Sequence, residues 1–330
     1  MVSRKLETCS FSDITTRNPN VLAARKLAEH AAAVDQGALI IGEPGTEKDI
    51  LAAAIHNAGP RAGKPFVALD CPYAAAALLE GAMFGGQIDA GLAPLMKKCA
   101  GGTLFLQEVG ALPLPVQARI ARAMQSGRLA LDSGENVAFD CRVIASTSED
   151  LRPAVEDRRF RHDLHDALAV NTLFISSLRH RKDDIPLLVH KYIDEFGRSL
   201  HKPLNNISDE AMNALVRYAW PGNVTELQTV IGRSAVLAKG EMILKDHLPK
   251  SIQRATREKK PALQDNDVLP LATIEKRHIQ RVLDYTGWHK VRTAQILGID
   301  RSTLYDKIRR YNLANPAEKL VELSEADRSL

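Results

Sequence analysis

The sequence predicts an α/β fold of the P-loop type that is followed by helices alone. Short apolar runs rich in β-forming residues alternate with helical patterns through the first half of the chain. A glycine-containing turn with a lysine follows the first of these runs, and no further strand is expected after about Leu178. Continuous apolar strands that alternate with helices are typical of a parallel sheet covered on both faces.

The expected strands are five in number. They are Ala38–Gly42, Pro65–Asp70, Thr103 (or Gly102) to Gln107, Arg142–Thr147 and Thr172–Ser176. Helical patterns begin at Ile50 and at Pro115, between strands. This alternation places the parallel sheet within residues 1–178.

Helical spacing dominates the rest of the chain. The expected helices are Asp183–Phe196, Ser208–Trp220, with Ser208 as N-cap, and Asn223–Ala238, followed by a helical block at Leu271–Leu313. Residues from Lys250 to about Val268 lack periodicity and indicate a linker. We therefore expect an α/β domain at 1–178, a helical subdomain at 179–250, a linker at 251–269, a C-terminal all-α domain at 270–313 and an acidic tail at 314–330.

Charge is distributed unevenly along the chain. The net charge is +4, but Lys250–Leu313 carries 14 basic and 7 acidic residues, against 30 and 33 in the remainder. A basic segment on a slightly acidic body favours contact with a polyanion at one end. A solvated lysine-rich face would give the same count.

The cysteines and apolar runs indicate the compartment. Cys9, Cys71, Cys99 and Cys141 form no CxxC pair, which favours reduced thiols and no metal site. No apolar run approaches the roughly 18 residues of a membrane span, and no signal peptide is evident. These observations predict a cytoplasmic protein.

The turn after the first expected strand reads GEPGTEKD. Its candidate phosphate-binding residues are Gly42, Glu43, Pro44, Gly45, Thr46, Glu47, Lys48 and Asp49. Glu47 stands where the P-loop pattern requires its second glycine, so the turn alone also fits an ordinary strand-to-helix connection. At about 4 Å and an effective dielectric of about 20, its charge would repel a phosphate by up to about 4 kcal/mol. Glu47 could instead cap the following helix or pair with Lys48.

Several further blocks occur in the same order as in a known family. They are PFVALDC, GGTLFLQEVGALP, VQARIARAMQSG, FRHDLHDAL, LRHRKDDIPLL and WPGNVTEL. With the loop, they resemble the AAA+ bacterial enhancer-binding proteins, ATPases that remodel RNA polymerase bound to sigma-54. The resemblance implies ATP as cofactor, a helical lid and assembly into a dimer or ring. It also implies that Glu108 activates water and that Arg161 is the first finger arginine.

The departures from this family pattern fall on the catalytic positions. Gln107 replaces the aspartate of LFLDE and cannot hold magnesium, which argues against Mg²⁺. Ala167 replaces the second finger arginine, Thr225 the sensor arginine, and Ser148 stands at another sensor position. The GAFTGA motif that contacts sigma-54 is absent from Met83–Gly102. Nucleotide binding is left open, and we expect hydrolysis to be lost.

The segment Ile274–Leu313 predicts a helix-turn-helix that binds double-stranded DNA. Helices Ile274–Tyr285, Val291–Leu297 and Arg301–Tyr311 are expected, with Ala294, Ile296 and Leu297 as core residues and Asp300 as a cap. An αα-hairpin fits the spacing but does not explain the basic residues beside the turn. The block resembles the Fis-type domain. The candidate DNA contacts are Arg292, Thr293, Arg301, Ser302, Thr303, Tyr305, Lys307, Arg309 and Arg310.

Three functions are compatible with this sequence. The leading hypothesis is a DNA-binding transcription regulator on a degenerate AAA+ scaffold, which self-associates or joins an intact relative or RNA polymerase. The second is a working ATPase that activates sigma-54 polymerase, and the third an adaptor whose α/β domain binds another protein. No receiver or ligand-sensing sequence precedes the α/β domain, so we expect no regulation by an N-terminal module.

Overall fold

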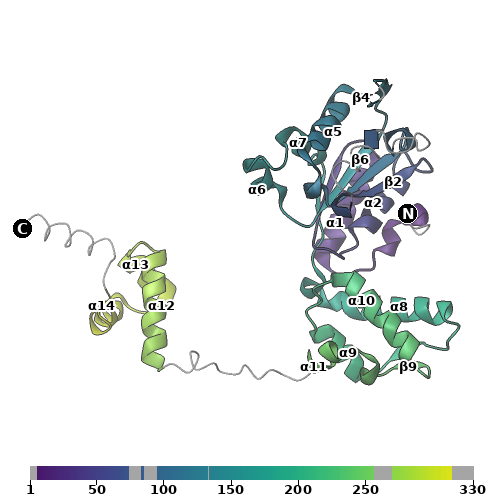
Figure 1. Ribbon diagram of the computed structural model, residues 1–330. Coiled ribbons are helices and arrows are strands. Elements are labelled where there is room, and N and C mark those ends of the chain that lie inside the picture. Colours follow the sequence, from purple (N-terminus) through teal and green to yellow (C-terminus); the bar gives the residue numbers. More distant parts are fainter. Residues whose placement is uncertain (1–5, 74–82, 85–94, 133, 256–269, 314–330) are drawn as a thin grey trace, which may run out of the picture. The chain divides into compact units, whose positions relative to one another are not determined.

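The computed structural model describes residues 6–73, 83–84, 95–132, 134–255 and 270–313. The described residues belong to two compact units, one within 1–257 and one within 258–330. The first unit contains the α/β domain and the helical lid, and the second contains the C-terminal helices (Figure 1).

A five-stranded parallel sheet forms the centre of the α/β domain. Its strands lie in the order β2 (Phe66–Asp70), β3 (Thr103–Gln107), β6 (Arg142–Thr147), β1 (Ala38–Ile41) and β7 (Thr172–Phe174). All five predicted strands are confirmed, within two residues at either end. The parallel sheet, the helical lid and the C-terminal helices together confirm the predicted fold class.

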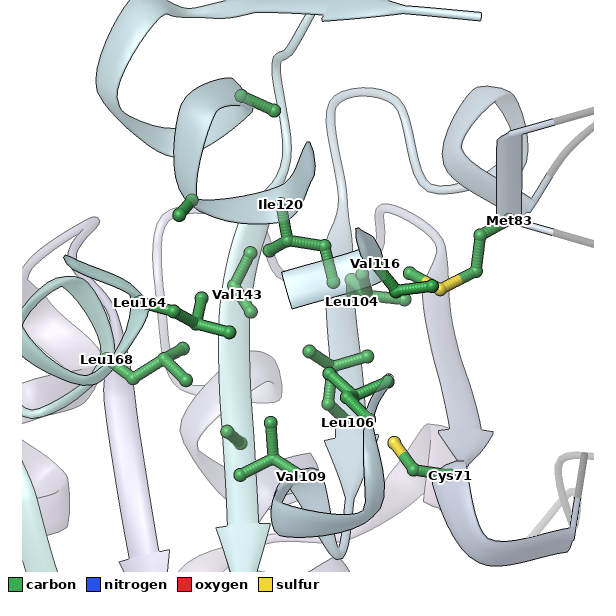
Figure 2. Packing of buried hydrophobic residues seen from close by; sticks show 14 of the residues in the cluster. Cys71, Met83, Leu104, Leu106, Val109, Val116, Ile120, Val143, Leu164 and Leu168 are labelled. Atoms are coloured by element: carbon green, nitrogen blue, oxygen red, sulfur yellow. The ribbon is translucent and has the colours of Figure 1, made fainter. Parts of the chain in front are cut away.

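Alternate residues along the central strands bury against opposite faces of the sheet. Leu104 and Leu106 pack with Val143 in one apolar cluster, whereas Phe105 packs with Ile144 in another. Figure 2 shows the first cluster, to which the helices of one face contribute Val116, Ile120, Leu164 and Leu168. Because both faces are covered, the central strands carry apolar residues at successive positions, and this is the pattern that predicted them.

The remaining elements of the α/β domain are helices and one hairpin. The helices are α1 (Pro19–Ala33), α2 (Lys48–Asn57), α4 (Leu95–Lys98), α5 (Leu114–Ser126), α6 (Leu151–Glu156) and α7 (His162–Leu168). Short 3₁₀ turns lie at Leu6–Thr8, Phe11–Asp13, Cys71–Tyr73 and Val109–Ala111. The antiparallel hairpin of β4 (Arg128–Ala130) and β5 (Asn136–Ala138) was not predicted from the sequence.

The lid packs four helices around a core of its own. They are α8 (Ile185–Ser199), α9 (Asp209–Arg217), α10 (Asn223–Leu237) and α11 (Lys250–Ala255), with 3₁₀ turns at Leu178–His180, Lys182–Asp184 and Lys245–His247. A two-residue parallel pair joins β8 (Asn206–Ile207) to β9 (Met242–Ile243). Ser208 caps α9 as predicted, since its side chain accepts a hydrogen bond from the Ala211 amide.

One predicted boundary was wrong. The linker was expected from residue 251, but Lys250–Ala255 forms α11, whose Ile252 side chain is buried in the lid core. A six-residue helix is too short to show the periodicity on which the sequence argument depended. Helix α11 therefore belongs to the lid, because its Ile252 side chain is part of the lid core.

The C-terminal unit consists of α12 (Leu271–Tyr285), α13 (Lys290–Leu297) and α14 (Arg301–Arg310). Its core contains Ile279, Leu283, Ala294 and Leu304, which are all buried. Ile296 was expected in this core, but its side chain is 51% exposed. On a helix of two turns, only one of two apolar neighbours at i and i+2 can face the partner helices.

Candidate functional site

The loop between β1 and α2 keeps the backbone path of a phosphate-binding loop. Gly45 has φ +76°, and a Cβ atom there would lie 2.3 Å from the Gly222 carbonyl oxygen, so only glycine fits. Glu47 has φ 71° and ψ 35°, in the left-handed region that favours glycine. For a residue with a Cβ atom this conformation costs about 1–2 kcal/mol. Glu47 thus adopts a glycine conformation at the position where a glycine is missing.

Lys48 is buried, and its ammonium group is fully engaged within the chain. Its Nζ donates to the carbonyl oxygens of Gly42 at 2.6 Å and Glu43 at 3.3 Å. It also forms an ion pair of 2.8 Å with Glu108 Oε1. The predicted phosphate-binding lysine therefore points to the loop carbonyls and to the residue after β3.

Glu108 is brought beside Ser148, the predicted sensor position. The backbone amide and the hydroxyl of Ser148 both donate to Glu108 Oε2 at 2.8 Å. Burial alone would raise the pKa of Glu108, but the Lys48 ion pair and the Ser148 hydrogen bonds outweigh it and hold that pKa below its usual range. Glu108 is therefore a charged hydrogen-bond acceptor, not an unengaged base.

The lid holds the tip of the loop. Arg179 forms a two-pronged ion pair with Glu43, which keeps the pKa of that carboxyl below its usual value. Asn223 Nδ2 donates to the Pro44 carbonyl at 2.9 Å and to Glu43 Oε2 at 3.2 Å. Within the loop, the Thr46 hydroxyl donates to the Glu43 carbonyl at 2.8 Å.

The amino end of α10 completes this contact. The backbone amides of Val224 and Thr225 donate to the Gly45 carbonyl at 2.9 and 3.3 Å. We call these contacts, with those of Glu43 and Pro44, the loop–lid clasp. Sequence reasoning missed Arg179 and Asn223, although both lie in blocks that match the family pattern.

Glu47 turns away from the phosphate side and towards the lid. The Tyr192 hydroxyl donates to Glu47 Oε1 at 3.4 Å, and burial raises the pKa of Glu47 despite the nearby charges of Lys191 and Arg181. Both expectations for Glu47 were wrong, since it makes no side-chain cap bond and does not pair with Lys48. The left-handed backbone at residue 47 aims the side chain off the helix axis.

Arg181 was not predicted as a site residue. Its guanidinium group is fully buried and, within the described structure, makes no hydrogen bond; its ion pair with Asp184 spans 4.0 Å. Desolvation lowers the pKa of this arginine. Together with Glu47 it lines a small apolar cavity of about 10 Å³.

A larger cavity of about 250 Å³ lies on the phosphate side of the loop. Two of the predicted departures from the family pattern, Gln107 and Thr225, line it. Three carboxylates and one ammonium group line it, those of Asp49, Asp70, Glu108 and Lys48. Glu47 also borders this cavity, but its carboxylate faces Tyr192 of the lid. Among the described residues that line this cavity, the only cation is thus a lysine already paired with a carboxylate.

Two positions that matter in the family lie on α7. Arg161 is exposed at the N-cap of α7 and pairs with Asp163 at 2.7 Å, while Ala167 follows in the last turn. The stretch in which GAFTGA was sought includes residues 85–94, which lie outside the described residues. Arg161, which the resemblance predicts to be a finger arginine, is thus paired with a residue of the helix it precedes.

The C-terminal unit has the geometry of a helix-turn-helix. Gly298 ends α13 in the left-handed conformation, with φ 64°, and Asp300 occupies the N-cap position of α14. Asp300 makes no side-chain cap bond, so the expected capping interaction is not formed. The His289 ring accepts from the Arg292 amide and caps α13 instead.

Most predicted DNA contacts lie on the surface of α13 and α14. Arg292, Arg301, Ser302, Tyr305, Arg309 and Arg310 are exposed, and Thr303 is half-buried. Thr293 is a correction: its side chain is buried, with its hydroxyl bonded to Thr286 and to the His289 carbonyl, so it cannot reach DNA. Lys307 pairs with Glu275 of α12.

The described residues set limits on two other kinds of site. They contain no group of three or more His, Cys, Asp or Glu side chains placed to hold a metal ion. None of the helices in the described ranges is both long and apolar enough to cross a bilayer.

Three family models match consecutive parts of the chain. They are the sigma-54 interaction domain at residues 14–174, the AAA+ ATPase lid domain at 179–265 and the bacterial regulatory protein, Fis family, at 270–311. These matches follow the order of the elements described above.

Curated relatives match over most of the chain. The regulatory protein ZraR of Escherichia coli K12 is 37% identical over 279 residues, which are 82% of this chain and 63% of ZraR. AlgB of Pseudomonas syringae is 36% identical over 91% of this chain and 67% of AlgB, and AtoC of E. coli K12 is 32% identical over 93% and 69%. The chain thus spans less than two thirds of ZraR.

Solved structures show the same architecture. NtrX from Brucella abortus in complex with ADP has a TM-score of 0.68 and 27% identity, covering 90% of this chain and 69% of NtrX. The complex of NtrX with ATP has a TM-score of 0.66 and 26% identity, with the same coverage. The sheet order, the lid, the Fis-type helices and these matches place the chain in the sigma-54 interaction-domain family of bacterial transcriptional regulators.

Proposed function

We propose that this chain is a DNA-binding transcription regulator whose AAA+ domain holds ATP without hydrolysing it productively and does not remodel sigma-54 polymerase. The observation that carries the proposal is the charge of the 250 Å³ cavity. Three carboxylates and one paired ammonium group line it, where phosphoryl transfer needs positive charge around the transferred phosphoryl group.

The positions that would supply this charge are neutral. Thr225 lines the cavity but carries a hydroxyl where the family pattern has the sensor arginine, and Ala167 carries a methyl group. Loss of one finger arginine lowers the rate by about 10³–10⁵-fold. These substitutions support a domain that assembles and binds, with ATP as a structural ligand.

The loop itself still fits a phosphate in part. Gly42, Gly45 and Lys48 keep the P-loop spacing, and the first turn of α2 offers unpaired backbone amides. The solved complexes of NtrX contain ADP or ATP, and this similarity supports a nucleotide ligand here. The candidate cofactor residues are those of the loop, residues 42–49, with Gln107.

The DNA-binding role rests on the exposed basic face of α13 and α14. In a helix-turn-helix the second helix enters the major groove with its first residues, here Arg301 and Ser302, at the base edges. Arg309 and Arg310 lie at the other end of α14, where they can contact phosphates. Double-stranded DNA is the proposed partner, and binding of two half-sites would require self-association.

The decisive experiment measures three properties of the same purified protein. We expect specific binding to a target duplex, ATP turnover no higher than that of Lys48→Ala, and no open complex with sigma-54 polymerase. ATP turnover near one per second that Lys48→Ala abolishes would refute the loss of hydrolysis. Open-complex formation would establish the alternative, an active sigma-54-dependent activator.

A further inference from the structure

Asp70 and Gln107 are neighbours across two parallel strands. They are the last residues of β2 and β3 and are paired in register. Register partners in adjacent parallel strands project from the same face of the sheet, about 4.8 Å apart. Both side chains line the 250 Å³ cavity together with Lys48 and Glu108. The cavity therefore has a carboxylate one strand away from the position where Gln107 provides only an amide.

We propose that Asp70 takes over the carboxylate role lost at Gln107, so that β2 holds a divalent cation that bridges to nucleotide phosphates in this cavity. The inference rests on the nucleotide binding proposed above. It changes the expectation drawn from Gln107 alone, which argued against Mg²⁺.

Asp70 is free to take this role. Within the described residues, no hydrogen bond or ion pair engages its carboxylate, whereas Glu108 is already held by Lys48 and Ser148. Burial and the charge of Glu108 raise the pKa of Asp70. A cation placed between these two carboxylates would remove their repulsion.

The charge of the cavity also calls for a cation. A polyphosphate that entered alone would face the carboxylates of Asp49, Asp70 and Glu108, with Lys48 as the one cation among the described lining residues. A divalent ion that binds both the phosphate and a carboxylate attracts the two anions and so offsets their mutual repulsion. The family resemblance implies that a nucleotide phosphate binds in this cavity. The acidic residues of this chain then require a cation to offset their repulsion of that phosphate.

The coordination habits of magnesium fit this arrangement. Mg²⁺ keeps several waters and is held by one or two carboxylates plus substrate phosphates. The described residues offer no group of three acidic, His or Cys side chains that would bind a metal without nucleotide. The ion is thus expected to bind only together with nucleotide, with Asp70 in contact directly or through a bound water.

The test compares nucleotide binding with and without a divalent ion in the full chain. A fluorescent ADP is titrated in Mg²⁺ and in EDTA, and Mn²⁺ binding in the presence of ADP is followed by electron paramagnetic resonance. For the unmodified protein we expect tighter ADP binding in Mg²⁺. Asp70→Asn should lower the Mn²⁺ affinity by about 10–100-fold, the range for residues that support a metal ligand.

Two further variants make the test specific. Asp70→Asn combined with Gln107→Asp moves the carboxylate back to β3 and should restore the Mn²⁺ affinity. Asp49→Asn tests the rival carboxylate of this cavity, which stands on α2 where the P-loop pattern has the Ser or Thr that binds magnesium. If β2 holds the ion, this variant should lower the Mn²⁺ affinity less than Asp70→Asn does. Asp70 is exposed and asparagine has the same shape, so thermal unfolding should confirm that these variants fold.

The outcomes separate this inference from the proposed function. ADP binding that is equal in Mg²⁺ and EDTA, or Mn²⁺ affinity that Asp70→Asn leaves unchanged, overturns the role of Asp70 and leaves the proposed regulator intact. A loss in Asp49→Asn alone would assign the ion to α2 and also overturn it. Absence of ADP binding under all conditions overturns both this inference and the proposed nucleotide ligand.

Discussion

The cavity beside Lys48 and the helix-turn-helix differ in whether their basic side chains are paired or exposed. In the cavity, Lys48 is paired with Glu108, and at its edge Arg179 is paired with Glu43. On α14, Arg301, Arg309 and Arg310 are exposed at the surface, and of the predicted basic contacts Lys307 is tied to a carboxylate, that of Glu275. The first region pairs its positive charges internally, whereas the second exposes most of them to a partner.

This contrast indicates how sensitive ATP hydrolysis and DNA binding are to the loss of single charged residues. An internally paired site binds an external anion only by exchanging partners, and its activity depends on several groups at once. An exposed basic face gains its binding energy from the release of counterions and tolerates single losses.

The largest expected effect concerns ATP hydrolysis. Restoring one group, by Gln107→Asp, Ala167→Arg or Thr225→Arg, should leave turnover at background, because phosphoryl transfer requires these charges together. The triple variant should raise turnover by about 10³-fold or more. Steady-state phosphate release measures this, with Lys48→Ala added to the triple variant as the control. Full activity from Thr225→Arg alone would show that the cavity is intact.

The next effect concerns the location of DNA binding. A fragment of residues 1–257 should lose specific binding, and residues 258–330 should retain it at reduced affinity, since the two are separate compact units. Specific affinities typically exceed non-specific ones by about 10³-fold or more. Fluorescence anisotropy with target and random duplexes gives both values. Equal affinity of fragment 1–257 and the full chain would place DNA recognition elsewhere.

A smaller effect should distinguish base contacts from phosphate contacts on α14. Arg301→Ala should weaken specific binding by about 1–3 kcal/mol and relax the preference at one base position. Arg309→Ala or Arg310→Ala should weaken all sequences alike and reduce the salt dependence. Titrations at two salt concentrations separate these cases. The exposed Asp306→Asn is a control with the opposite charge change on the same helix, expected to strengthen binding to both duplexes.

The smallest expected effect is a loss of stability of the C-terminal unit at low pH. Hydrogen bonds from Lys307 and Tyr311 lower the pKa of Glu275 from its usual 4.5. A carboxyl whose folded-state pKa is depressed stabilises the fold above its unfolded-state pKa and loses this contribution as the pH falls through the folded-state value. The melting temperature of residues 258–330 should therefore fall more steeply below about pH 4.5 than that of Glu275→Gln. Parallel curves would mean that the Glu275 contacts add no stability.

The sequence was most informative where a single physical requirement, such as burial of both sheet faces, determines which residue types follow one another. The five strands were predicted because burial of both sheet faces requires apolar residues such as Leu104, Phe105 and Leu106 in succession. The phosphate-binding loop was a candidate from Gly42, Gly45 and Lys48, but this turn alone fitted an ordinary strand-to-helix connection better, and only the blocks that follow it favoured a P-loop. The exposed arginines of α14 followed from helical spacing around Leu304.

The features that the sequence did not predict depend on contacts between residues far apart in the chain. Lys48 and Glu108 are distant in sequence, and so are Glu43 and Arg179, and their pairing arises only when the sheet and lid assemble. Thr293 was assigned to DNA because it lies among basic residues, but its hydroxyl bonds back to Thr286. The neighbourhood of Asp70 and Gln107 required the strand register, which a single sequence does not give.

The loop–lid clasp has a consequence for the timing and apparent strength of binding. A ligand that passes between the loop and α10 must first release the Gly45 carbonyl, the Asn223 amide and the Arg179–Glu43 pair. If each contributes about 1 kcal/mol, the open form is populated at less than about one part in a hundred. The affinity measured for such a ligand is reduced by that fraction, and its association slows accordingly. The clasp would therefore raise the ligand concentration at which the domain is half occupied, without changing the shape of the binding curve.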